Sequence, residues 1–173
     1  MQISQTELNF LTKEYEKLKD EQLKRIEFRD HMIYLTLGVI GAVFSFCLEK
    51  PEYNIAFLVL PFICAILGWT YFANDRKVSE IKIYIKSFLL PQLIKDKTYQ
   101  SENWEVKKTE KRKFSKLNQL IIDIILFIVS SFVSIGAFLL LNSCFYWYHY
   151  LAIGLETLML IYLSWLFTSN YYD

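Results

Sequence analysis

The chain contains few glycines, prolines and cysteines: five, three and three among 173 residues. It contains no glycine-rich phosphate loop, His-Glu-x-x-His pair, nucleophile elbow or Cys-x-x-Cys pair. Cys47, Cys64 and Cys144 have no metal-ligand spacing. Cys47 and Cys144 either form a disulfide or remain buried thiols. We therefore expect no enzymatic activity, no cofactor and no bound metal.

Charged residues are also scarce in four apolar runs, which cover most of the chain outside two polar segments. These runs are Met32–Leu48, Asn54–Ala73, Gln119–Leu141 and Cys144–Phe167. Each is about long enough to cross a ~30 Å hydrocarbon core at 1.5 Å per residue. We predict an all-α membrane protein whose four transmembrane helices form two hairpins, with the lipid bilayer as its first partner.

The positive charges lie almost entirely on one side of these runs. Of 19 Lys and Arg, six precede the first run and twelve lie between Arg76 and Lys116, which leaves only Lys50. Because basic segments stay cytoplasmic, we expect both termini to face the cytoplasm of a bacterial inner membrane. The predicted organisation is a cytoplasmic helix (1–31), a membrane hairpin (32–73), a cytoplasmic helix with a basic loop (74–117), a second hairpin (118–167) and a cytoplasmic tail (168–173).

The two polar segments carry apolar residues at heptad spacing, which favours helices that pack together. The stripes are Leu8, Leu11, Tyr15 and Leu18 before the first run, and Val78, Ile81, Ile85 and Phe88 after the second. Folding the first hairpin about residues 50–53 brings Tyr15 opposite Phe88 and Leu18 opposite Ile85. We predict an antiparallel cytoplasmic stalk that ends at Pro91. An amphipathic helix lying on the membrane would have a similar periodicity.

Small residues in the first hairpin predict close packing of its helices. Gly38, Ala42 and Ser45 nearly share one face, and the same register places Gly38 opposite Ala65 and Gly68 opposite Leu35.

The basic loop is a candidate site for an anionic lipid or a phosphate-bearing ligand. Its cations are Lys107, Lys108, Lys111, Arg112 and Lys113. The alternative is a solvated positive flank that only fixes topology. We expect no nucleic acid as a partner.

Polar residues inside the second hairpin are the strongest functional candidates, because a charge at bilayer depth costs about 2.5–3.5 kcal/mol. They are Asp123, Ser130, Ser134, His149 and Glu156. Seven-residue spacings place Asp123 with the serines on one face, and His149 with Glu156 on another. Either these faces line a polar lumen between subunits, or Glu156 is neutral and bonded to Ser130 or Ser131, and Asp123 to Tyr162.

Three sequence stretches resemble small bacterial multi-pass membrane proteins. They are ANDRKVSEIKIYIK at 73–86, ENWE at 102–105 and EYEKLKDEQLKRIEFR at 14–29. Some similar proteins are effectors of antiphage systems such as CBASS or Panoptes, in which a cyclic nucleotide signal controls membrane damage. The resemblance implies a membrane effector, but no nucleotide-sensing residue is carried over to this chain.

We therefore expect a homo-oligomeric inner-membrane effector that disrupts the membrane on a cytoplasmic signal, in antiviral defence. The signal would be a nucleotide or a soluble cytoplasmic partner. Two alternatives remain open: an ion or proton channel or small transporter that uses Glu156, and a membrane anchor that recruits a soluble partner.

Overall fold

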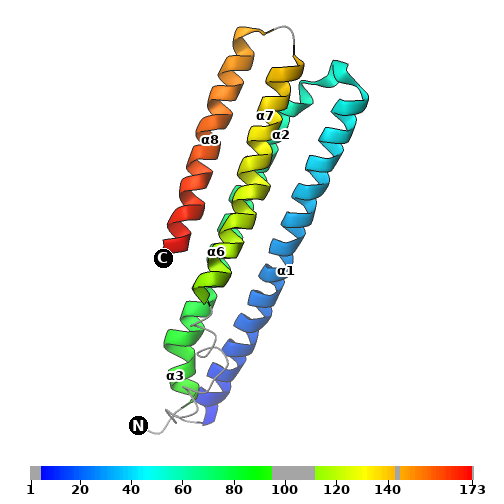
Figure 1. The fold of residues 1–173 in the computed structure, drawn as a ribbon. Helices are drawn as coiled ribbons and strands as arrows, with labels where there is room; N and C mark the ends of the chain where they lie inside the picture. The colour runs from blue at the N-terminus through cyan, green and yellow to red at the C-terminus, as the bar shows by residue number, and fades with distance from the viewer. Residues whose placement is uncertain (1–4, 95–111, 143–144, 173) are drawn as a thin grey trace. The chain divides into compact units, whose positions relative to one another are not determined.

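The computed structural model describes residues 5–94, 112–142 and 145–172, and these residues are helical almost throughout, with no strand among them (Figure 1). The main helices are α1 (Gln5–Glu49), α2 (Ala56–Tyr84), α6 (Arg112–Asp123), α7 (Ser130–Leu141) and α8 (Trp147–Tyr172). Two π-helical segments, η2 (Ile85–Leu89) and η3 (Ile124–Val129), continue α2 and α6. The short helices η1 (Pro51–Tyr53) and α3 (Leu90–Leu93) complete the described elements. The predicted all-α class is confirmed.

Four helical stretches are long and apolar enough to cross a membrane, as the sequence predicted. They are Gln5–Glu49, Ala56–Leu93, Lys116–Leu141 and Trp147–Ser169. Hydrocarbon offers no hydrogen-bond partner to the backbone, so an apolar segment in a bilayer must satisfy its own N–H and C=O groups, and a helix does this. Length and composition therefore identify a membrane protein.

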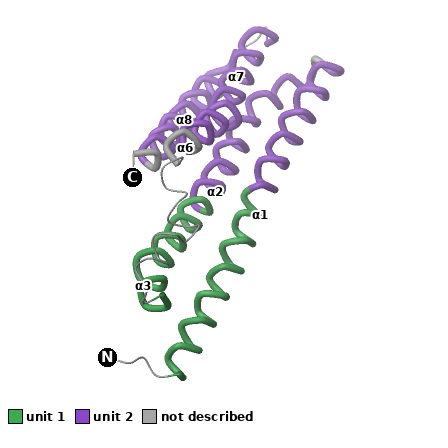
Figure 2. Tube along the Cα trace, turned by 60° about the horizontal axis from the view of Figure 1, so that its bottom comes forward, with its two compact units in different colours: residues 1–29, 74–115 green, residues 30–73, 116–173 purple. Residues whose placement is uncertain are grey.

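The chain divides into two compact units (Figure 2). Unit 1 comprises residues 1–29 and 74–115, and unit 2 comprises residues 30–73 and 116–173. Both α1 and α2 contribute to each unit, so the two units are connected by helical backbone. Each unit has its own apolar core.

The core of unit 1 is formed by Leu11, Ile85, Leu89 and Leu90, with Tyr15, Leu18 and Ile81 packed against them. Leu8 and Val78 are half-buried. Three polar contacts also join α1 to α2 in this unit. The Tyr84 hydroxyl donates to Glu14 Oε1 at 2.9 Å, Asn74 Nδ2 donates to the Arg25 carbonyl at 2.6 Å, and Arg29 Nη1 lies 3.2 Å from Asp75 Oδ1.

The π-helical segment η2 changes two details that the sequence pattern predicted for unit 1. In η2 the Leu90 N–H donates to the Ile85 carbonyl, so this turn holds one residue more than an α-turn. The inward face consequently moves by one position: Leu89 is fully buried, whereas Phe88 is 48 % exposed and stacks on Tyr84. Pro91 does not end the helix as predicted, because helical backbone continues through α3 to Leu93.

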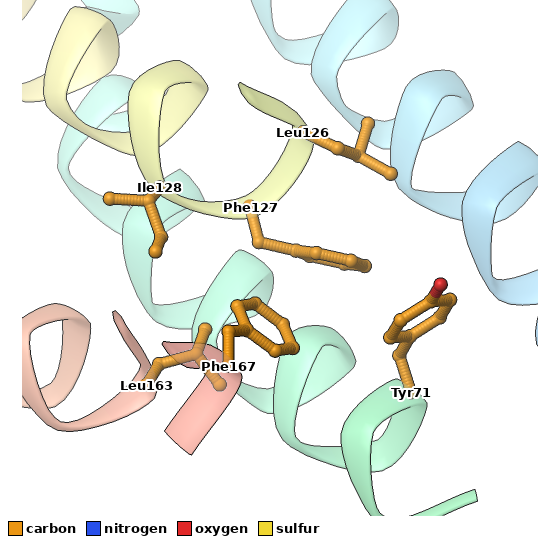
Figure 3. Packing of buried hydrophobic residues seen from close by; sticks show 6 residues of the cluster. All are labelled: Tyr71, Leu126, Phe127, Ile128, Leu163 and Phe167. Carbon is orange, nitrogen blue, oxygen red and sulfur yellow. The ribbon is translucent and has the colours of Figure 1, made fainter. Parts of the chain in front are cut away.

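Unit 2 is built around six side chains from α2, η3 and α8: Tyr71, Leu126, Phe127, Ile128, Leu163 and Phe167 (Figure 3). The Phe127 ring is fully buried, with its centroid 5.4 Å from that of Tyr71 and 6.0 Å from that of Phe167. Such aromatic pairs add to the energy of burial. A second cluster contains Cys47, Phe57, Leu58 and Phe138.

Gly68 allows α2 to approach the first of these clusters closely. A Cβ atom at Gly68 would lie 2.7 Å from Leu163 Cδ2 and 3.2 Å from Phe127 Cγ. The sequence had placed Gly68 opposite Leu35 of the first hairpin. In the structure its close neighbours are instead Leu163 and Phe127, from the second half of the chain. The other predicted packing residues differ among themselves: Ala65 is buried, but Gly38, Ala42 and Ser45 are exposed.

We predict opposite effects from alanine at two glycines of unit 2. Gly68→Ala should lower the free energy of unfolding, because overpacking a filled core costs about 1–3 kcal/mol. Gly154→Ala is the matched control, since a Cβ there meets nothing within 4 Å and the helix gains about 1 kcal/mol in propensity. Thermal unfolding in detergent measures both, and a Gly68→Ala protein at least as stable as Gly154→Ala would contradict this packing.

Candidate functional site

The predicted intramembrane polar residues of α8 lie on its buried face. Glu156 is 6 % exposed and His149 is 5 % exposed, and they share this face with Leu160, Leu163 and Phe167. On the neighbouring segment, Ser131 and Ser134 are fully buried. The polar side chains therefore point into unit 2 and are covered within a single copy of the chain.

The level of Glu156 is bracketed by two contacts between α8 and the third apolar segment. Toward the start of α8, the His149 ring lies 5.2 Å from that of Phe138. Toward its end, the Phe167 ring lies 6.0 Å from that of Phe127. Antiparallel helices keep this register, so Glu156 lies at the level of the serines between Phe127 and Phe138. Its Oε2 atom is buried and has no hydrogen-bond partner among the described residues.

The serine hydroxyls at this level donate their hydrogens to backbone carbonyls. Ser130 donates to Leu126, Ser131 donates to Phe127 at 2.6 Å, and Ser134 donates to Phe57 at 2.6 Å. The first two bonds lie within one helix, as is common for serine in apolar helices. Ser134 instead connects α7 to α2. Because each hydroxyl carries one hydrogen, none of the three can also donate to Glu156.

Cys64 is a component of this site that sequence reasoning did not assign. Its side chain is fully buried on α2, and its thiol lies within hydrogen-bonding range of the Ser131 and Ser130 hydroxyls. The available signal was its position near the middle of an apolar run. Cys47 is a free buried thiol that contacts the Tyr53 carbonyl at 3.6 Å, and Cys144 lies outside the described residues.

His149 has a structural role at the start of α8. Its ring Nδ1 atom accepts a hydrogen bond from the Tyr146 backbone N–H at 3.3 Å, and the backbone N–H of His149 donates to the Tyr146 carbonyl at 3.0 Å. Since Nδ1 is an acceptor, a neutral ring carries its hydrogen on Nε2. The rings of Phe138, Tyr146 and Tyr148 surround it. These contacts fix the first turn of the helix.

The remaining predicted site residues do not join this cluster. Asp123 is buried at the end of α6, and the ring of Tyr162 stacks on Trp69 at 5.6 Å and on Trp165 at 5.9 Å. Lys107, Lys108 and Lys111 lie outside the described residues, as do the side chains of Arg112 and Lys113. Within the described part of the chain, no group of His, Cys, Asp and Glu could hold a metal ion.

An apolar groove of about 340 Å³ runs along α2 and α8, with Trp69 and Tyr162 among its lining residues. None of its lining residues is a serine, cysteine or carboxylate. The groove is therefore separate from the polar cluster of Cys64, Ser130, Ser131, Ser134 and Glu156, which we name the polar seam.

Alanine substitution of two fully buried serines, three residues apart, tests the hydrogen-bond partners assigned in the polar seam. Ser134→Ala should cost about 0.6 kcal/mol, and at most about 1.7 kcal/mol, because it removes a hydrogen bond between helices. Ser131→Ala removes a bond within its own helix and should cost less. Thermal unfolding of both variants in detergent compares them directly, and a larger loss for Ser131→Ala would contradict the assigned partners.

Comparison of the chain with protein-family models, with curated proteins and with solved structures found no match in any of the three.

Proposed function

We propose that the protein is a homo-oligomeric effector of a bacterial inner membrane, and that a cytoplasmic signal received by unit 1 makes its membrane helices rearrange and breach the bilayer. The observation that carries this proposal is the unbroken helical path between the units. The helix α1 has 45 residues, about 67 Å at 1.5 Å per residue, and a ~30 Å hydrocarbon core needs less than half of it.

The contacts within unit 1 support a role as the receiving end. Side chains of α1 and α2 meet there through an apolar cluster and through the pairs Tyr84–Glu14 and Arg29–Asp75. A ligand or partner that separates or rotates these helices changes α1 and α2 themselves, because no loop intervenes before the apolar runs. In the proposed topology unit 1 is a cytoplasmic antiparallel stalk, and the two pairs of spans are hairpins.

The weak burial of α1 supports assembly through its membrane segment. Only 11 % of the residues in its most apolar stretch are buried, against 44 % for α2. A Cβ added at Gly38 or Gly41 would meet nothing within 4 Å. Small exposed residues allow a helix of another copy to approach closely. Burial of Glu156 and His149 within one copy further supports a closed state in which no polar lumen exists between subunits.

The effector proposal predicts depolarisation of cells by the induced protein, read with a membrane-potential dye in the presence of its genomic neighbours. Gly38→Leu should reduce depolarisation several-fold, because it fills the proposed contact between copies. Gly154→Leu is the matched control, since Gly154 also faces open space but lies on α8. Cells that keep their potential with the wild-type protein, alone or with its neighbours, would contradict the proposal.

A proton or ion channel that uses Glu156 is the second candidate, supported by the burial of an unpartnered carboxyl oxygen in a spanning helix. Such a channel would conduct through a single copy, because Glu156 is covered inside the bundle. The same assay separates the two candidates: only for the channel should Glu156→Gln abolish depolarisation while Gly38→Leu leaves it unchanged.

A further inference from the structure

Glu156 is a buried acid that forms no ion pair with any of the residues that the structure describes. The apolar runs of α1 and α2 contain no charged residue, and the stretch from Ile124 to Leu141 contains no titratable one. The cations of α1, α2 and α6 lie outside their apolar runs, and the other titratable side chains within the runs are Tyr34 and Cys47 on α1, Cys64 and Tyr71 on α2, and Asp123 on α6. None of these is basic, so none can balance a carboxylate.

The basic group nearest to Glu156 along α8 is His149, which lies seven residues away, or about 10 Å along the helix. That separation is too long for a direct hydrogen bond. Its Nδ1 atom is already occupied by the Tyr146 N–H. The tyrosines of α8 cannot supply a positive charge, because a phenol is never cationic.

The hydrogen-bond donors of the polar seam also indicate that Glu156 is not ionised. An ionised carboxylate only accepts hydrogen bonds, whereas a protonated carboxyl can also donate one. Ser130, Ser131 and Ser134 have committed their hydrogens to carbonyls, and Thr157 on α8 donates to the Ile153 carbonyl at 2.7 Å. These hydroxyls can still accept through their oxygens. With their hydrogens committed, these hydroxyls offer a carboxylate no donor, so the polar seam favours the neutral acid.

We propose that Glu156 is a proton-binding site, and that its bound proton holds α8 against α2 and α7. The neutral acid carries no charge, so it needs neither a cation nor a hydrogen-bond donor from the polar seam. When the proton leaves to water, the remaining charge has no cation and no free hydroxyl hydrogen within the seam, where the Cys64 thiol is only a weak donor. Water must then enter to solvate it, which separates α8 from α2 and α7. The ligand of this site is a single proton, and its release opens the polar seam.

This inference deepens the proposed function, because it rests on a closed state of the membrane helices and names a condition that opens them. A site buried within one copy couples protonation to helix packing in each subunit separately. Its test therefore needs neither the oligomer nor the cytoplasmic signal.

The labelling rate of Cys64 measures opening of the polar seam. The full chain with Cys47→Ser and Cys144→Ser, in liposomes, retains Cys64 as its one thiol. The ratio of N-ethylmaleimide labelling rates at alkaline and acidic pH is compared between this protein and the same protein with Glu156→Gln. Both contain the same thiol, so the intrinsic pH dependence of its reactivity cancels. We expect the ratio to be several-fold larger with Glu156, and equal ratios would overturn the proposal.

Infrared spectroscopy of the wild-type protein provides a second measurement, in which variants serve only to assign the band. A carboxylic-acid C=O band should be present near neutral pH and disappear at alkaline pH. Glu156→Gln should remove this band and Asp123→Asn should leave it. If the only band from Glu156 near neutral pH is that of a carboxylate, the proposal is wrong. Neither the labelling rate nor the infrared band depends on depolarisation of cells. A failure of the proton-site proposal can therefore be told apart from a failure of the effector proposal.

Discussion

The inability of hydrocarbon to hydrogen-bond with a polypeptide is the constraint on which the rest of this structure depends. It makes each apolar run helical, because only then are its N–H and C=O groups satisfied internally. It also directs the serine and threonine hydroxyls to carbonyls of the bundle, since no water is available at that depth. The character of the polar seam follows from this, because hydroxyls that are satisfied in this way have no hydrogen left to donate to a carboxylate.

The helices of unit 2 must also approach one another closely, which a small residue on α2 and large aromatic residues on the facing segments make possible. Gly68 lets α2 reach Leu163 and Phe127, and the rings of Phe127 and Phe167 fill the space that remains. The segment η3 supplies Phe127, and its wider π-turn follows directly after Asp123. Dispersion and shape complementarity must hold these helices together, because lipid chains remove the hydrophobic advantage of burial. The exposed face of α1 lacks such packing, which is why we propose that another copy covers it.

The sequence predicted the elements of this fold well and their contacts less well. Run length and charge determine where helices can cross a bilayer, and these properties are local. The neighbours of Gly68 are not local, because its contacts come from η3 and α8. Phe88 was assigned inward because the heptad pattern assumes a constant turn, which η2 interrupts. The sequence placed Glu156 at bilayer depth but left open whether it lines a lumen or is buried, and the donors committed by Ser131 and Ser134 depend on geometry that no residue pattern contains.

The account requires that unit 1 lies in the cytoplasm, where a signal can reach it. The most direct test is labelling of single cysteines with a membrane-impermeant maleimide in intact cells, in a protein without its native cysteines. Lys50→Cys should be labelled in intact cells, and Lys77→Cys only after the membrane is permeabilised. Labelling of Lys77→Cys in intact cells, as fast as that of Lys50→Cys, would contradict the topology and the proposed function.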